Sequence, residues 1–273
     1  MSIGNFIPQI WADRLEPLFQ KSLVFGNLVN RNYEGQISGA GDTVKINFPG
    51  RVDVRDYTTS DLTYDALDAP QTTLTIDKKK YYAFYVEDID RVQSKPDFLD
   101  EYMQEAAYGI KDSVDSAIAA NWSDAGSITA STAINSANVL ASLLALSQAL
   151  DEKNVPTNDR WVVIPSWFKT KLVLAKVLVE NTTNTAFNDG FVGRVAGFDV
   201  WQSNNVPLVS SNYKIMAGTN RAITFAGQFT EGPEVLRMTQ RFGNYIRGLY
   251  VFGTRVIQPD ALAVLDATIA PES

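Results

Sequence analysis

Cysteine and histidine are both absent from the 273 residues of this chain. Without cysteine there is no disulfide framework, no thiolate metal site and no cysteine nucleophile. Without histidine the chain lacks the commonest general base near neutral pH, the usual zinc ligands and the serine–histidine type of nucleophile pair. Most hydrolase mechanisms are thereby excluded, and we expect no catalytic residue, no metal site and no cofactor.

Charged residues make up only 20% of the chain, and positive charge is the scarcer sign. The 24 lysines and arginines are outnumbered by 31 aspartates and glutamates, which gives a net charge of −7. A broad basic face that grips nucleic acid is therefore not expected, because phosphate neutralisation needs clustered lysine and arginine. An acidic wall can still enclose DNA.

Long apolar runs are also missing. None approaches the ~20 residues that cross a bilayer, and residues 1–9 lack the basic and apolar parts of a secretory signal. We expect a protein that is made in a cytosol and has no contact with a membrane.

The N-terminal stretch carries large apolar side chains between helix breakers. Trp11, Leu15 and Phe19 belong to a segment that also contains Pro8 and Pro17, so one long helix is excluded. An apolar arm fits the pattern better. It packs either on its own body or on a neighbouring subunit, since exposed apolar patches usually mark such contacts.

Alternation of apolar and polar residues predicts two long strands, 43–54 and 72–86. The polar, acidic segment between them, 55–70, is too long for a tight hairpin turn. A two-stranded ribbon is marginal by itself in water, so we expect this ribbon to lie against another surface.

The clearest helix is predicted for 97–122, where apolar residues recur at steps of three and four after Pro96. At ~1.5 Å per residue this helix would extend about 39 Å, which is long for a compact domain. Its other face carries an exposed acidic strip.

The remainder predicts a mixed-layer domain followed by strands. Helices are expected at 139–150 and 166–176, the second capped by Ser166, with a strand at 161–164 between them. From residue 191 onward short apolar runs separated by glycine and proline predict mainly strand. The glycines of 193–197 lack a phosphate-loop lysine and are expected to lie in turns.

Several stretches resemble the major capsid proteins of tailed bacteriophages, and together they extend over nearly the whole chain. The match in 190–200, which runs into 203–207, is the most specific. The stretches are 27–35 (NLVNRNYEG), 41–47 (GDTVKIN), 73–77 (TLTID), 82–84 (YAF), 86–90 (VEDID), 190–200 (GFVGRVAGFDV), 203–207 (SNNVP) and 247–257 (RGLYVFGTRVI).

The resemblance implies an α+β fold of the Hong Kong 97 capsid type, in which an arm, an extended loop, a peripheral domain with a long spine helix and an axial domain follow one another. The predicted limits are 1–36 for the arm, 37–86 for the extended loop, 87–124 for the peripheral domain with its spine helix at 97–122, 125–235 for the axial domain, and 236–273 for strands that return to the peripheral domain and the C-terminus.

The implied function is that of a shell subunit. Identical copies would form pentamers and hexamers of an icosahedral shell that encloses double-stranded DNA without sequence-specific binding. The resemblance also implies a scaffolding protein, a portal and decoration proteins as further partners, assembly in the cytoplasm of a host bacterium, and a final place in the virion capsid. No scaffolding segment is evident ahead of the arm.

Ten residues are predicted to lie at contacts between subunits. The lysines pair with a neighbour's acidic strip or form a solvated cluster. The carboxylates at 87 and 88 favour an intersubunit ion pair over catalysis or metal binding, because no histidine partners them. The ten residues are Trp11, Leu15, Phe19, Arg51, Arg55, Lys78, Lys79, Lys80, Glu87 and Asp88.

Two alternatives stay open. An encapsulin-like nanocompartment of the same fold would enclose proteins in place of a genome, and nucleic acid content would discriminate it. A histidine-free hydrolase with paired carboxylates would be a compact monomer.

Overall fold

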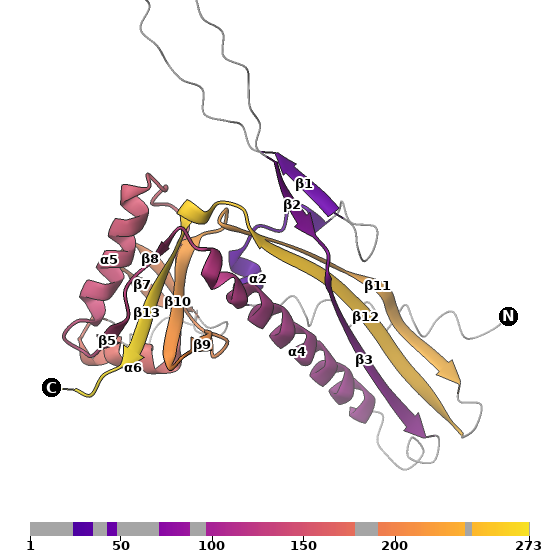
Figure 1. Ribbon diagram of the computed structural model, residues 1–273. Helices are drawn as coiled ribbons and strands as arrows, with labels where there is room; N and C mark the ends of the chain where they lie inside the picture. The colour runs from indigo at the N-terminus through magenta and orange to yellow at the C-terminus, as the bar shows by residue number, and fades with distance from the viewer. Residues whose placement is uncertain are drawn as a thin grey trace, which may run out of the picture.

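The computed structural model describes residues 24–34, 43–47, 71–87, 97–177, 191–237 and 242–272. Figure 1 shows an elongated half, in which helix α4 lies along a three-stranded sheet, and a second half that holds helices α5 and α6 with an eight-stranded sheet. None of the helices in these ranges is long and apolar enough to cross a membrane.

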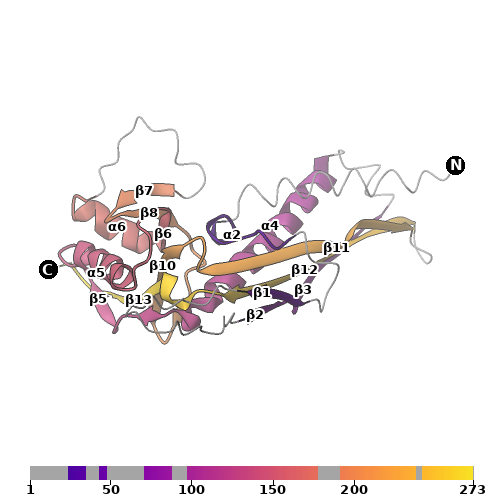
Figure 2. The same cartoon turned by 90° about the horizontal axis from the view of Figure 1, so that it is seen from above.

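The elongated half is built on the antiparallel strand order β11-β12-β3. These strands are β11 (Ile223–Arg237), β12 (Gly243–Val256) and β3 (Lys78–Glu87). Figure 2 shows β11 and β12 extending far beyond the second half of the molecule. The sheet forms the framework on which the helix and the N-terminal segment are placed.

Helix α4 (Asp97–Ala119) follows the predicted apolar spacing. Met103, Ala107, Ile110, Val114 and Ile118 are all buried, whereas the residues between them on the outer face are exposed. At ~1.5 Å per residue the helix is about 35 Å long. It is shorter than predicted, because residues 120–124 form a 3₁₀ turn at its end.

The side chain of Asn121 accounts for this early end. Its Nδ2 donates to the carbonyl of Ile118 at 3.1 Å and to Thr254 Oγ1 at 3.0 Å. A side chain that occupies a helical carbonyl and a neighbouring strand competes with continued α-helix. The prediction of a helix up to residue 122 is therefore wrong at its last turn.

The second half contains the strand order β4-β13-β10-β6-β8-β7, with β5 beside β13 and β9 beside β10. The five residues of β6 are all buried, as expected for a central strand. The strands are β4 (Ser127–Ile128), β5 (Thr132–Ile134), β6 (Arg160–Ile164), β7 (Phe191–Val195), β8 (Phe198–Gln202), β9 (Leu208–Val209), β10 (Asn212–Thr219) and β13 (Leu262–Ile269).

Helices α5 (Val139–Glu152) and α6 (Ser166–Leu174) confirm the two predicted helices of this half. The predicted cap is wrong: Pro165 occupies the N-cap position, and Ser166 is the first helical residue and makes no capping hydrogen bond. The Pro165 carbonyl accepts a hydrogen bond from the Phe168 backbone N–H at 3.1 Å. A backbone carbonyl thus does what the serine hydroxyl was expected to do.

The turn between β7 and β8 confirms one of the predicted turn glycines, Gly197, whereas the prediction is wrong for Gly193, which lies inside β7. Ala196 and Gly197 both have positive φ, +52° and +84°, and connect the paired residues Val195 and Phe198. Two central residues with positive φ match the twist of a two-residue hairpin. Gly193, at φ +147°, lies at the irregularity in the same pair of strands.

The predicted ribbon is only partly confirmed. β1 (Thr43–Asn47) pairs antiparallel with β2 (Gln71–Thr75), and we call this pair the ribbon foot. The single strand expected over 72–86 is wrong, because the chain leaves β2 at Ile76 and Asp77 and β3 pairs with β12. The alternation continues through the bend, so periodicity alone could not reveal it.

The ribbon foot lies against the three-stranded sheet. Val44, Ile46, Leu74 and Ile76 are buried together with Ala226 of β11 and Val251 of β12. The expectation that the ribbon needs a supporting surface is confirmed for this part. Gly253 makes the close approach possible, because a Cβ at this position would collide with the carbonyl oxygen of Thr75.

The described part of the N-terminal segment also packs on this framework. The short helix α2 (Phe25–Leu28) buries Phe25 completely. Asn30 then pairs with β11: its N–H donates to the Ile223 carbonyl and its carbonyl accepts from Phe225 N, both at 2.9 Å. Residues 24–34 therefore cover the start of the β11 edge.

One continuous apolar cluster joins the two halves. It runs from Phe25 and α4 through β11 and β12 to α5 and the eight-stranded sheet. Because the same core is shared, the two halves are packed parts of one body.

Strand membership departs from the predicted domain limits. β10 ends at Thr219 in the eight-stranded sheet and β11 begins at Ile223 in the three-stranded sheet, so 223–235 pair with β12. β13 returns to the eight-stranded sheet, beside β10. Local alternation identifies a strand, but long-range pairing decides which sheet it joins.

Candidate assembly surface

Strand β3 carries aromatic residues on both of its faces. Tyr82 and Phe84 pack into the core beneath α4. Tyr81 and Tyr85 point to the opposite face, where they are 77% and 58% exposed. A strand with large apolar side chains on both faces is expected to have both faces covered.

Three apolar residues form a row across the far end of this sheet. Tyr245 of β12 lies directly between Tyr85 of β3 and Leu236 of β11 in the strand register. Tyr245 and Leu236 are 48% and 39% exposed. The three side chains share one face because directly paired residues of antiparallel strands do so. We call Tyr81, Tyr85, Tyr245 and Leu236 the aromatic face.

A groove of about 360 Å³ runs along the aromatic face, lined by Tyr85, Leu236 and Tyr245 together with Ala83 and Arg247. Arg247 occupies the neighbouring row, where two of its nitrogens contact Oε2 of Glu234 at 2.8 and 2.7 Å. The ion pair supplies a polar edge beside the apolar row. An exposed apolar patch with a polar edge is typical of a protein–protein contact.

The three predicted lysines lie at the start of β3. Lys78, Lys79 and Lys80 pair with Phe252, Val251 and Tyr250 of β12. Lys79 and Lys80 are exposed, and Lys78 Nζ lies 3.7 Å from Asp77 Oδ1. Lysines on an edge strand hinder uncontrolled pairing with other chains, so this placement also has a protective effect.

The other predicted contact residues are described less completely or not at all. Glu87 is the last residue of β3 and pairs through its backbone with Gly243. The remaining six lie outside the described residues. They are Trp11, Leu15, Phe19, Arg51, Arg55 and Asp88.

The residues of the aromatic face were missed by sequence reasoning. Alternation in 72–86 was used only to predict a strand, and Tyr81 and Tyr85 were given no role. Aromatic residues on both parities of one strand were the available signal. The partners Tyr245 and Leu236 could not be found without the strand register.

One carboxylate of the described residues has a strongly raised pKa, and its surroundings give it a structural role. Asp115 of α4 is almost fully buried, and its Oδ2 accepts from the Val24 backbone N–H at 3.3 Å. Burial raises the pKa of Asp115 to about 6, although backbone hydrogen bonds from Val24, Gly26 and Phe25 and the charge of Lys111 act to lower it. Asp115 thus holds α2 against α4.

No group of three or more potential metal ligands occurs within the part of the chain that the structure describes.

Comparison with solved structures defines the class of protein. A structure from Mycobacterium phage Che8 is similar with a TM-score of 0.74 and 26% identity over 89% of this chain and 91% of that chain. The capsid of the cyanophage P-SCSP1u is similar with a TM-score of 0.72 and 17% identity over 92% and 89% of the two chains. The fold is the Hong Kong 97-like capsid fold, in its α+β form.

An encapsulin also has a similar fold. The encapsulin of the holo-SrpI complex from Synechococcus elongatus is similar with a TM-score of 0.63 and 14% identity over 91% of this chain and 89% of that chain. At this identity the likeness concerns the fold alone. Among curated proteins, none matches the sequence.

The family described as phage capsid protein matches residues 69–265, and the chain belongs to this family. It is the coat protein of a phage virion, a structural subunit that assembles with copies of itself into the shell.

Proposed function

We propose that the aromatic face is one of the surfaces through which identical copies build this shell. The observation that carries the proposal is the row of Leu236, Tyr245 and Tyr85, which leaves large apolar side chains in water on an otherwise packed sheet. Burial of such side chains contributes roughly 1–2 kcal/mol each. Repeated over a shell, contacts of this size accumulate.

The contact is heterologous: the face of one copy meets a different surface of the next, so that rotation closes pentamers and hexamers. We propose that Lys79, Lys80 and Glu87 lie near this contact, and that Trp11, Leu15, Phe19, Arg51, Arg55 and Asp88 add further contacts from the arm and the extended loop. The Nζ of Lys78 already lies 3.7 Å from Oδ1 of Asp77 in the same chain, so we propose that Lys78 contributes less to the contact between copies.

The double variant Tyr85→Ser, Tyr245→Ser tests the role of the aromatic face. Both side chains are half exposed, so the variant is expected to fold, and shells are expected to be lost in sedimentation velocity and negative-stain microscopy. Leu208→Ser, which removes an exposed apolar side chain from β9, serves as the matched control. Normal shells from the double variant at wild-type concentration would refute the role of the aromatic face.

We propose further that the shell encloses double-stranded DNA by closure. The net charge of −7 supports a wall that does not grip phosphates strongly. Scaffolding, portal and decoration proteins are proposed as partners, with assembly in the host cytoplasm, and the chain is proposed to catalyse no reaction. The nanocompartment alternative would be supported by protein cargo in place of DNA.

We place the limit between the peripheral and axial parts at the turn 220–222, where the chain changes sheets.

A further inference from the structure

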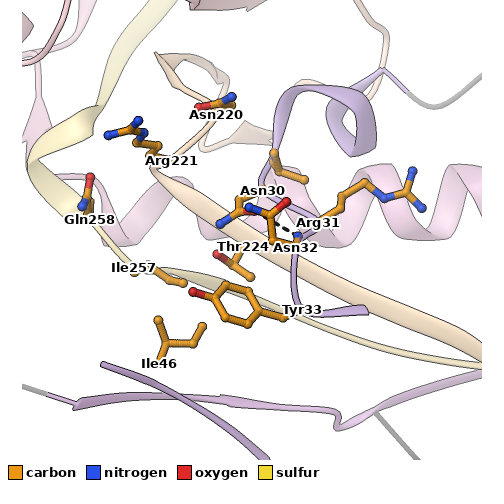
Figure 3. A pocket seen from close by; sticks show the side chains of 11 residues that line it. Asn30, Arg31, Asn32, Tyr33, Ile46, Asn220, Arg221, Thr224, Ile257 and Gln258 are labelled. Carbon is orange, nitrogen blue, oxygen red and sulfur yellow. Dashed lines mark hydrogen bonds between the residues drawn. The ribbon is translucent and has the colours of Figure 1, made fainter. Parts of the chain in front are cut away.

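A polar pocket of about 550 Å³ lies where the N-terminal segment, the ribbon foot and the turn before β11 meet. Figure 3 shows its lining: Thr224 and Tyr33 lie near the centre of the view, and Asn220, Arg221 and Gln258 lie together on one side of them. Ile46 of β1 and Ile257 contribute apolar walls. The pocket is therefore formed by segments that are far apart in the sequence.

The charge of this pocket is opposite to that of the chain. None of the eleven residues that line it is acidic. Arg221 is exposed and has no hydrogen bond or ion pair within the described ranges. The second arginine, Arg31, is already engaged: its Nε donates to Glu34 at 2.9 Å, and Figure 3 shows its guanidinium directed away from the other side chains.

A buried hydroxyl in the lining also lacks a partner. Thr224 is fully buried, and its Oγ1 makes no hydrogen bond in the described part of the chain. Buried polar groups in native proteins are nearly always paired, so an orphan next to a pocket points to a group that binds there. The Tyr33 hydroxyl and the side-chain amides of Asn220 and Gln258 add further donors.

We propose that this pocket binds an acidic side chain of a second copy of the chain, with Arg221 as the cation. A planar guanidinium matches a carboxylate in bidentate geometry, and the surrounding donors suit a group that only accepts hydrogen bonds. The 31 acidic residues of a second copy exceed its 24 basic ones, so its charge is complementary to a pocket that has arginine and no acidic side chain. The inference rests on the proposed self-assembly and names one more contact in it.

The space continues beyond Arg221. A second hollow of about 760 Å³ shares Asn220, Arg221, Ile257 and Gln258 with the first and reaches the turn at 153–156. Lys153 and Asp260, which both line it, form an ion pair at 3.1 Å. An extended segment can therefore lie along both hollows, with its carboxylate at Arg221.

Zero-length crosslinking tests the contact directly. In Arg221→Lys, carbodiimide is expected to join the new amine to a carboxylate in ion-pair contact, with loss of one water. Mixing copies labelled with ¹⁴N and ¹⁵N before assembly shows in peptide maps whether the linkage joins two copies. A crosslink within one copy, or none at residue 221, would overturn the proposal.

Assembly measurements give an independent readout. Arg221→Gln is expected to raise the concentration needed for assembly by at least about tenfold, and Arg194→Gln, which removes an exposed charge from β7, by less than about twofold. Thr224→Val is expected to weaken assembly while leaving the isolated subunit as stable or more stable, because the orphan hydroxyl is gone.

Two further outcomes distinguish failure of the proposed function from failure of the pocket contact. If the variant Tyr85→Ser, Tyr245→Ser forms normal shells, the role of the aromatic face fails, while the isotope-resolved crosslink at residue 221 still reports on the pocket. If Arg221→Gln assembles normally but its particles retain less DNA, the pocket binds phosphate and the inference is wrong.

Discussion

Asp115 shows how one buried side chain makes the fold sensitive to pH. Its pKa is raised from 3.8 to about 6 by burial. Above pH 6 the ionised carboxylate costs folding free energy. As the pH falls from about 6 to 3.8 the native protein binds a proton that the unfolded chain does not, so stability from this group rises.

We expect the variant Asp115→Asn to remove this dependence. Between pH 7 and pH 4.5 the free energy of unfolding of the wild-type subunit should gain on the order of 2 kcal/mol relative to Asp115→Asn. Urea unfolding of unassembled subunits measures the difference. Parallel curves for the two proteins would contradict the assignment.

A second carboxylate acts in a different pH range. The hydrogen bond from the Lys171 side chain, with help from Ser136, lowers the pKa of Glu272 from 4.5 to about 2. Its contribution is present above pH 4.5 and is lost as the pH falls toward 2. The two effects have opposite signs, and their pH ranges overlap only between 3.8 and 4.5.

At the scale of elements, the ribbon foot depends on the absence of a side chain at Gly253. We expect Gly253→Ala to force the carbonyl of Thr75 away from β12 and to destabilise the subunit by about 1–3 kcal/mol. Hydrogen exchange should show the loss at residues 71–76. Unchanged protection in that strand would mean that the foot tolerates the shift.

Gly109→Ala provides the matched control. Gly109 lies on the exposed face of α4, and an added Cβ meets nothing within 4 Å. Because alanine is the better helix former, this variant should gain about 0.5–1 kcal/mol. If Gly253→Ala destabilises the subunit while Gly109→Ala stabilises it, the loss at residue 253 comes from the steric collision and not from the change in backbone entropy.

How far the sequence predicts these elements depends on whether the signal is local. The spacing of Met103, Ile110 and Val114 predicts α4, because one buried stripe fixes a helix. The bend after Ile76 and the partner of β3 were not predictable, since alternation is the same whichever strand lies alongside.

The candidate site shows the same difference between local signals, which the sequence reveals, and long-range pairing, which it does not. The lysines of β3 were found from charge alone, but their neighbours on the sheet were not. Tyr245 and Leu236 come from strands 150 residues or more further along the chain, and the row they form with Tyr85 exists only after folding. The pocket at Arg221 likewise has walls from segments that share no motif.

At the scale of the whole molecule, the acidic charge predicts how the shell holds its contents. DNA inside native particles should remain protected from nuclease in 1 M salt, where the Debye length is only about 3 Å. Retention by closure does not depend on ionic strength, whereas retention by a basic lining does. Loss of protection in intact particles at high salt would contradict the proposal, and protein cargo without DNA would favour the nanocompartment.

The continuous core has a mechanical consequence for such a shell. Because one apolar cluster extends from Phe25 through α4 to α5, rotating the two halves against each other would open closely packed interior surface. The described part of the subunit is therefore rigid, and the packing of α4 contributes to this rigidity. In a shell of pentamers and hexamers, as we propose, differences in curvature would be absorbed at the contacts between subunits, and small changes in sequence at those contacts should alter particle size.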